Sequence, residues 1–216
     1  MTNGNDQSES AALSRLERDF LGVKSIPSDS YYGIQTSRAA DNFQVTGFPI
    51  SSFPKLIRAI AAIKKAAAET NRQLGLLSDT LADAIGETCD EIMQNQLFEN
   101  FIVDLIQGGA GTSTNMNVNE VIANRSLELL GYEKGQYHII NPNDHVNLSQ
   151  STNDVYPTAI KIALIQSIQE LIPAMTNLIH AFQSKEQEFA DVLKIGRTQL
   201  RDAVPMTLGQ EFGAYA

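Results

Sequence analysis

The longest helical pattern in the chain covers residues 153–190, NDVYPTAIKIALIQSIQELIPAMTNLIHAFQSKEQEFA. Its apolar residues alternate four and three positions apart, as in the seam of a helix packed lengthwise in a bundle. The seam consists of Ile168, Ile172, Met175, Ile179 and Phe182. Pro157 falls in the first turn, where proline is tolerated, and Pro173 predicts a kink rather than a break. At 1.5 Å per residue this helix would be about 50–55 Å long, so we expect other helices alongside it, from this chain or from partner subunits.

The composition is that of a globular protein with an acidic surface. The 216 residues include 16 Lys+Arg and 25 Asp+Glu, which gives a formal net charge of −9, and 43% are hydrophobic. Nucleic acid is therefore not expected as a partner, because a phosphate-binding groove needs clustered Lys and Arg. The single cysteine, Cys89, cannot form an internal disulfide, and no His/Cys spacing resembles a zinc site. We expect neither a metal nor another cofactor.

The first twenty residues, MTNGNDQSESAALSRLERDF, contain no basic segment followed by an apolar one, so they do not resemble a signal peptide. No run approaches about 18 uncharged apolar residues, the length that a membrane span requires. The sequence predicts a cytoplasmic protein without a membrane segment. Residues 1–14 are expected to be a flexible tail.

Shorter helical patterns fill the rest of the chain and predict an all-α, mainly helical fold. Residues 53–74 begin with Pro54 near the first helical position, and Gly75 follows the last turn. Ser78 or Asp79 can cap a second helix, whose apolar stripe consists of Leu81, Ile85, Cys89 and Ile92. A short β-prone run (101–106) precedes a third helix, roughly 115–130, which ends at Gly131. We expect a helical N-terminal domain over residues 15–150 and the start of a central helical-bundle domain over residues 151–216.

The glycine-rich loop 108–117, GGAGTSTNMN, opens the third helix. It lacks the lysine of a phosphate-binding P-loop, and Thr114 stands where a dinucleotide-binding motif needs its third glycine. What remains is a helix N-terminus with free N–H groups among hydroxyl and amide side chains, an arrangement that suits a carboxylate. An elaborate helix cap would explain the same residues.

Two further polar segments also lead into helical patterns. They are residues 141–157, NPNDHVNLSQSTNDVYP, and residues 196–207, GRTQLRDAVPMT. Three such segments exceed what helix capping requires, and together they could surround a small anion with neutral donors. A serine hydrolase is disfavoured, because no G-x-S-x-G motif occurs.

At these segments the chain resembles the aspartase/fumarase superfamily. The resemblance lies in GTSTNMN, NPNDHVNLSQSTNDVYPTA, KIGRTQLRDAVPMTLGQEF and the earlier SDSYYGIQTSRAADNF, and it extends from about Gly22 to Ala216. It implies a mostly helical, three-domain subunit, whose central helices form a twenty-helix bundle in a homotetramer with active sites shared between subunits. It also implies reversible elimination from a C4 dicarboxylic acid to give fumarate, through an enediolate-like carbanion.

The resemblance assigns substrate contacts to six residues, which are Thr112, Ser151, Thr152, Asn153, Thr198 and Gln199. Asn143 and Asp144 match a secondary anion site of the fumarases, although an Asn-Asp pair that only shapes the loop explains them equally well. Family members place a serine base on a loop resembling GSSxMPxKxN, which is missing here, so no catalytic base is assigned. The chain resembles an N-terminal fragment, and we expect it to be inactive alone.

The wording of the motifs favours the aspartate-deaminating branch, with L-aspartate and fumarate as substrate and product. Fumarases usually have histidine in GRTH, where this chain has Gln199, and TSTNMN and SQSTN also resemble the deaminating branch. A malate/fumarate hydratase is the alternative enzyme. A scaffold without activity is the alternative outside enzymes, and the full set of hydroxyl side chains disfavours it.

Overall fold

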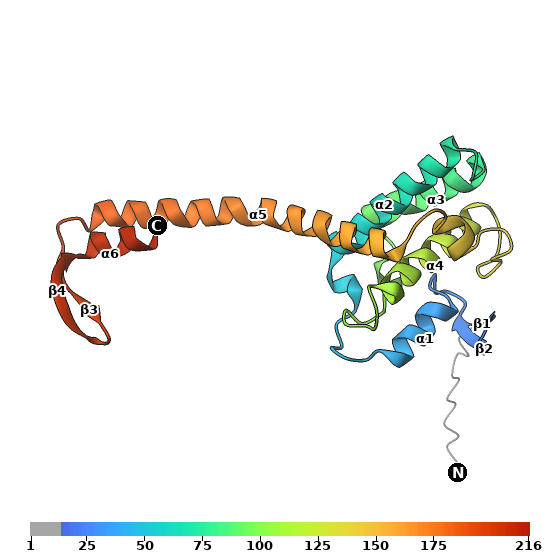
Figure 1. Ribbon diagram of the computed structural model, residues 1–216, viewed down its shortest axis with the longest axis horizontal. Coiled ribbons are helices and arrows are strands. Elements are labelled where there is room, and N and C mark those ends of the chain that lie inside the picture. Colours follow the sequence, from blue (N-terminus) through green and yellow to red (C-terminus); the bar gives the residue numbers. More distant parts are fainter. Residues whose placement is uncertain (1–13) are drawn as a thin grey trace, which may run out of the picture. The chain divides into compact units, whose positions relative to one another are not determined.

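The computed structural model describes residues 14–216 (Figure 1). The predicted tail, residues 1–14, lies outside the described residues except for Ser14. The chain divides into two compact units, one extending to Ala163 and the other covering Leu164–Ala216. Each unit is described by itself.

The first unit consists mainly of helices, as the sequence predicts. An antiparallel hairpin, β1 (Ser14–Asp19) and β2 (Gly22–Pro27), precedes α1 (Ile34–Asn42), α2 (Pro54–Gln73), α3 (Asp79–Met93) and α4 (Thr112–Leu129). Short helical turns lie between them at η1 (Ile50–Ser52), η2 (Phe98–Asn100) and η3 (Pro142–Val146). The last helix to begin in this unit is α5 (Thr152–Glu188), which continues into the second unit.

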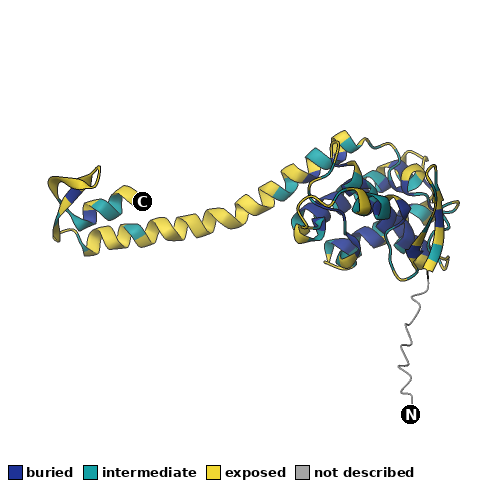
Figure 2. Cartoon of the chain, turned by 90° about the horizontal axis from the view of Figure 1, so that it is seen from below, coloured by how far each residue is buried: buried dark blue, intermediate teal, exposed yellow. Residues whose placement is uncertain are grey.

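The hydrophobic core lies between α2, α3 and α4, and Figure 2 shows most of the buried residues in the first unit. Ile60, Ile85, Cys89, Ile92 and Ile122 are completely buried. The predicted stripe of the second helix is therefore largely confirmed, with Leu81 partly buried at its start. Several predicted ends are confirmed as well. Ser78 caps α3 by accepting the Leu81 N–H (3.5 Å), and Gly131, at φ +80°, follows α4.

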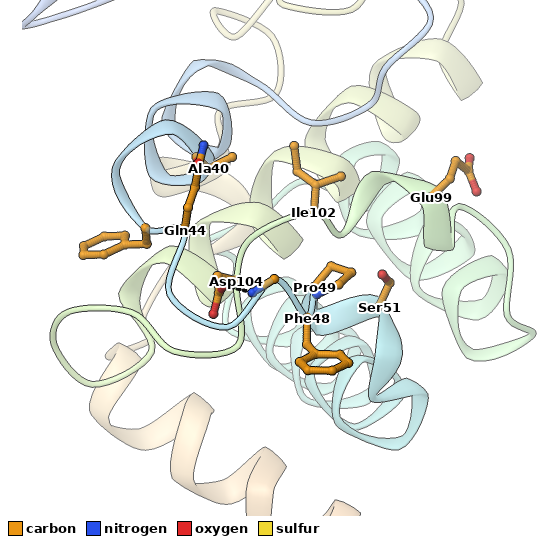
Figure 3. A pocket seen from close by; sticks show the side chains of 10 residues that line it. Ala40, Gln44, Phe48, Pro49, Ser51, Glu99, Ile102 and Asp104 are labelled. Atoms are coloured by element: carbon orange, nitrogen blue, oxygen red, sulfur yellow. Dashed lines mark hydrogen bonds between the residues drawn. The ribbon is translucent and has the colours of Figure 1, made fainter.

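The β-prone run 101–106 was expected to be extended, but within the described chain it forms only one isolated bridge, between Pro49 and Asp104. The Asp104 carboxylate instead accepts the backbone N–H groups of residues 45, 46, 47 and 106. Burial opposes ionisation, but these hydrogen bonds outweigh it and hold the pKa of Asp104 below its usual range. The loop is therefore fixed by a side chain rather than by a sheet, beside the pocket in Figure 3.

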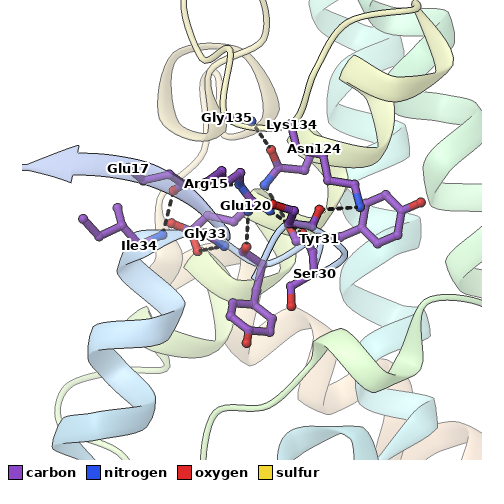
Figure 4. A network of polar contacts seen from close by, with 12 residues as sticks. Arg15, Glu17, Ser30, Tyr31, Gly33, Ile34, Glu120, Asn124, Lys134 and Gly135 are labelled. Atoms are coloured by element: carbon purple, nitrogen blue, oxygen red, sulfur yellow. Dashed lines mark hydrogen bonds and ion pairs between the residues drawn. The ribbon is translucent and has the colours of Figure 1, made fainter. Parts of the chain in front are cut away.

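A buried carboxylate from α4 fixes the start of α1 (Figure 4). Glu120 accepts the N–H groups of Gly33 (2.8 Å), Gln35 (2.9 Å) and Thr36 (3.0 Å). Gly33 itself provides no side-chain cap, so a residue 87 positions away in sequence supplies the hydrogen bonds. Burial raises the pKa of Glu120, although the hydrogen bonds from the helix end oppose this rise.

The second unit contains the rest of α5, the hairpin β3 (Leu193–Thr198) and β4 (Arg201–Thr207), and α6 (Leu208–Tyr215). α5 continues through Pro173 without a break, as predicted. The polar segment 196–207, expected to be a loop, is largely this hairpin, a correction to the sequence analysis. Thr207 caps α6 reciprocally with Gln210, because each backbone N–H is accepted by the other side chain (2.9 and 3.1 Å).

Candidate active site

The N-terminus of α4 lies against the first turn of α5. Gly111 precedes α4 with φ +82°, and a Cβ at this position would lie 2.3 Å from the ring of Tyr156. Only glycine permits both the left-handed backbone and this close approach. Thr112 is the first residue of α4 and is exposed. The glycine loop therefore places the Thr112 hydroxyl at the N-terminus of α4 beside α5, where the Thr114 N–H is accepted by Gln107 Oε1 (2.8 Å).

The second predicted segment reaches the same place. Ser151 is exposed and accepts the N–H of Asn153 (3.2 Å), and Thr152 is the first residue of α5. Asn115 Nδ2 donates to Thr152 Oγ1 (3.4 Å), which joins the first turn of α4 to the start of α5. The structure therefore brings together Thr112 and the segment 151–153, and it presents hydroxyl groups at two adjacent helix N-termini.

A network of amide side chains, in which Asn147 is partly buried, supports this segment. The Oδ1 atom of Asn147 accepts from Lys64 Nζ (2.7 Å), Asn115 Nδ2 (3.0 Å) and Asn119 Nδ2 (3.3 Å). Asn147 Nδ2 donates to the carbonyl of Gln150 (3.0 Å), one residue before Ser151. The position of the hydroxyl-bearing segment therefore depends on side chains of α2 and α4.

Lys64 is completely buried on α2. Removal from water lowers the pKa of Lys64 to about 7, because the charged form loses its hydration. No carboxylate pairs with Lys64 among the salt bridges found in residues 14–216. A titratable lysine therefore contacts Asn147, the residue that supports the hydroxyl-bearing segment.

The pair Asn143 and Asp144 lies on η3, a π-helical turn, and both residues are exposed. Their backbone N–H groups donate to Asn141 Oδ1, at 2.8 and 3.1 Å. The Val146 N–H donates to the carbonyl of Asn141 (3.2 Å). This hydrogen bond has the five-residue spacing of a π-helix. The side chain that shapes this turn is therefore Asn141, and the Asn143 and Asp144 side chains are left at the surface.

Thr198 and Gln199 belong to the second unit, where Thr198 ends β3 and Gln199 begins the turn to β4. Both are exposed. Gln199 (φ +50°) and Leu200 (φ +63°) both adopt the left-handed conformation that a tight two-residue hairpin turn requires. This conformation is costly for residues other than glycine, and such strain is concentrated at functional sites.

Sequence reasoning missed the buried amides and the lysine that support the site. Lys64 follows Ile57 by seven positions and Ile60 by four, so it lies on the buried face of α2. A lysine on the otherwise apolar face of α2 was the feature of the sequence that could have revealed it. Asn115, Asn117 and Asn119 are all buried in α4, an unusual density of amides for a core helix. Within residues 14–216, no group of three or more His, Cys, Asp or Glu could hold a metal ion.

Comparison with known proteins places these features in a family. A family model described as Lyase matches residues 22–216. The chain is 56% identical over 205 residues to an aspartate ammonia-lyase of Pseudomonas aeruginosa, covering 95% of this chain and 43% of that protein. It is 51% identical over 203 residues to an aspartate ammonia-lyase of Escherichia coli K12, covering 94% and 42%. The chain therefore spans less than half the length of these curated relatives.

Solved structures show the same fold. A fumarate lyase:delta crystallin from Brucella melitensis matches with a TM-score of 0.90 and 55% identity, over 94% of this chain and 47% of that one. A class II fumarase from Schistosoma mansoni matches with a TM-score of 0.84 and 40% identity, over 94% and 43%. Since the family match runs from residue 22 to the last residue, the chain belongs to the lyase family, in which its curated relatives are aspartate ammonia-lyases.

Proposed function

We propose that this chain forms part of an aspartate ammonia-lyase, which converts L-aspartate reversibly to fumarate and ammonia. The observation that supports this most strongly is that the exposed hydroxyls of Thr112 and Ser151, and the half-buried hydroxyl of Thr152, lie at the adjacent N-termini of α4 and α5. Helix N-termini favour negative charge, and hydroxyl groups donate hydrogen bonds. Such a site suits a dicarboxylate.

The chemistry explains why neutral donors are needed. Removal of a proton from Cβ places negative charge on the neighbouring β-carboxylate, which becomes an enediolate-like dianion. The C–N bond then breaks, ammonia leaves with the bonding electrons, and the Cα–Cβ double bond of fumarate forms. Donors aimed at the developing charge lower the barrier, and each contributes about 2–4 kcal/mol. We assign this role to Thr112, Ser151, Thr152 and Asn153, and we assign the base to none of the residues of this chain.

Thr198 and Gln199 complete the proposed substrate contacts. A neutral amide at position 199 would hydrogen bond to substrate without adding a titratable group beside the departing amine, and no cofactor is needed for the elimination. Asn143 and Asp144 remain candidates for a secondary anion site, because their side chains are exposed on η3.

We further propose that residues 15–150 form the N-terminal domain and residues 151–216 the start of a central helical bundle, assembled as a homotetramer in the cytoplasm. Among the described residues, α5 is the one helix long and apolar enough to cross a membrane. Gln166, Gln169 and Glu170 lie near its middle, as suits a bundle helix better than a lipid-facing one.

The principal alternative is a malate/fumarate hydratase, which the likeness to the class II fumarase keeps open. The test is a full-length protein in which this chain replaces the matching part of the Pseudomonas aeruginosa enzyme. We expect fumarate and ammonia from L-aspartate, and no measurable turnover of L-malate. Faster turnover of malate than of aspartate would overturn the proposal. The remainder expressed without this chain serves as the control.

A further inference from the structure

We propose that Lys64 is a positioning residue for the substrate-binding segment, acting through Asn147 to hold Ser151 and Thr152 in place. This inference rests on the proposed function, because it assumes that these hydroxyls contact substrate. Lys64 lies on α2, a helix that contributes no residue to the proposed substrate contacts. Its ammonium group nevertheless lies 2.7 Å from Asn147 Oδ1.

Asn147 connects two helices, α2 and α4, to the segment that precedes α5. Its Oδ1 accepts from Lys64 on α2 and from Asn115 and Asn119 on α4, while its Nδ2 donates to the Gln150 carbonyl. Asn115 also donates to Thr152 on α5. Asn71, two turns beyond Lys64 on α2, donates to the Leu148 carbonyl (3.0 Å) and holds the same segment from a second point.

Stability alone does not explain a lysine at this position. A completely buried ammonium that is paired with neutral amides costs free energy, and an apolar side chain of similar volume would avoid that cost. Three donors converge on one amide oxygen, and the hydrogen bond from Lys64 is the shortest of them (2.7 Å). Asn115 Oδ1 and Asn119 Oδ1 have no hydrogen-bond partner among the described residues, so the Lys64 hydrogen bond belongs to a polar network that is not fully satisfied, which again does not favour stability.

The segment itself needs such support. Ser149 adopts a left-handed conformation (φ +61°), which is unfavourable for serine and is maintained only where the surroundings impose it. Loss of the Lys64 hydrogen bond would let residues 147–151 relax, and the hydroxyls of Ser151 and Thr152 would then lose their alignment with Thr112. A displacement of about 1 Å at a reacting group can cost on the order of 100-fold in rate.

The test compares Lys64→Met with Lys65→Met in the full-length protein described above. Lys65 is the adjacent lysine, but it pairs with Asp90 at the surface (2.6 Å), so it controls for loss of a charge on α2. We expect Lys64→Met to lower kcat for L-aspartate about 10- to 100-fold with little change in KM, and Lys65→Met to leave both unchanged. Lys64→Gln, which retains a donor, should be intermediate and serves if Lys64→Met fails to fold.

Two readouts separate positioning from a merely structural role. In a Ser151→Ala background, Lys64→Met should cause little further loss, because the group that it positions is already missing. In the chain itself, amide hydrogen exchange of residues 147–153 should be faster in Lys64→Met than in Lys65→Met, with the helices α2 and α4 equally protected. Additive losses, or equal exchange in the two variants, would overturn the inference.

Failure of the inference is distinguishable from failure of the proposed function. If Ser151→Ala loses activity while Lys64→Met behaves like Lys65→Met, the positioning role is wrong and the substrate site stands. If Ser151→Ala retains full activity, the proposed site itself is wrong, and with it the inference drawn from it.

Discussion

Asn115 Nδ2, in the first turn of α4, donates a hydrogen bond to the hydroxyl oxygen of Thr152, the first residue of α5 (3.4 Å). Because Thr152 Oγ1 accepts this bond, its own proton is directed elsewhere and is available to a ligand. The amide thus couples two helix N-termini and orients a donor between them.

Removing a hydroxyl at the site should impair catalysis without unfolding the protein. Thr112→Val and Ser151→Ala are each expected to lower kcat/KM for L-aspartate by roughly 10²–10³ in the full-length protein, as for loss of an oxyanion donor. Thr198→Val should do the same. Formation of fumarate, followed by its ultraviolet absorbance, measures the effect. Thr70→Val is the control, because Thr70 is exposed on α2 and its hydroxyl only donates to the Ala66 carbonyl. Near-normal rates in all three site variants would contradict the assignment.

The close approach of α4 and α5 gives a prediction about stability. Gly111→Ala should lower the free energy of unfolding by about 2–4 kcal/mol, from the left-handed backbone plus the overlap with Tyr156. Gly131→Ala is the matched control, because its φ is +80° but an added Cβ would meet nothing within 4 Å. We expect a loss of about 1 kcal/mol there, measured by urea unfolding of the chain. Equal losses would show that Tyr156 imposes no constraint.

The helices and most of their ends were predictable, because each depends on residues near in sequence. Ser78, Gly131 and Thr207 act within one turn of the helices that they begin or end, so local rules identify them. The exception at α1 is instructive. Its first N–H groups are accepted by Glu120 and, at Ile34, by Glu17, and no local pattern could identify a cap 87 residues away.

The hairpins and the side chains that support the site were not predictable either, because they depend on unusual turn residues and on tertiary contacts. The turn between β3 and β4 uses Gln199 and Leu200 at positive φ, where sequence rules look for Asn-Gly or Gly. The run 101–106 has the composition of a strand, but Asp104 takes up the backbone N–H groups that a neighbouring strand would need. The prediction that Thr112 and Ser151 belong to one site came from the resemblance to a family and not from spacing, because only tertiary contacts bring the starts of α4 and α5 near each other.

The buried lysine makes stability depend on pH. The pKa of Lys64 is about 7 in the folded chain, against about 10.4 when unfolded, so the unfolded state binds more protons between these values. The free energy of unfolding should therefore rise with pH from about 7 to 8.5, by about 1 kcal/mol per unit. Above that range the Cys89 thiol opposes the rise, because burial raises its pKa to about 12.

Urea unfolding at a series of pH values checks this prediction. The rise should disappear in Lys64→Met and persist in Lys65→Met, since the ammonium of Lys65 is half-exposed beside Asp90. The same slope in all three proteins would mean that Lys64 keeps its ordinary pKa in the folded chain.

The residue at position 199 should control the pH profile. Gln199→His introduces an imidazole with a pKa near 6.5, so kcat/KM for L-aspartate should acquire an additional ionisation near that pH. Gln199→Asn is the control, because it keeps a neutral amide and asparagine tolerates the left-handed conformation. Identical profiles for the two variants would place residue 199 away from the reacting groups.

Finally, the 216-residue chain produced alone should associate and lack activity. α5 exposes a row of large apolar side chains on the part that belongs to the second unit, including Leu164, Ile165, Ile168, Leu171, Ile172, Met175 and Leu178. Burying apolar surface contributes about 25 cal/mol per Å², so a wet face of several hundred Å² favours association. Light scattering should give a mass above that of a monomer, and circular dichroism should confirm the helices. Replacing Ile168, Ile172 and Met175 together with glutamine should shift the mass towards the monomer. Activity should be missing in both forms, because we assign the base to no residue of this chain, and a monomer that turned over aspartate would refute both the bundle and the shared site.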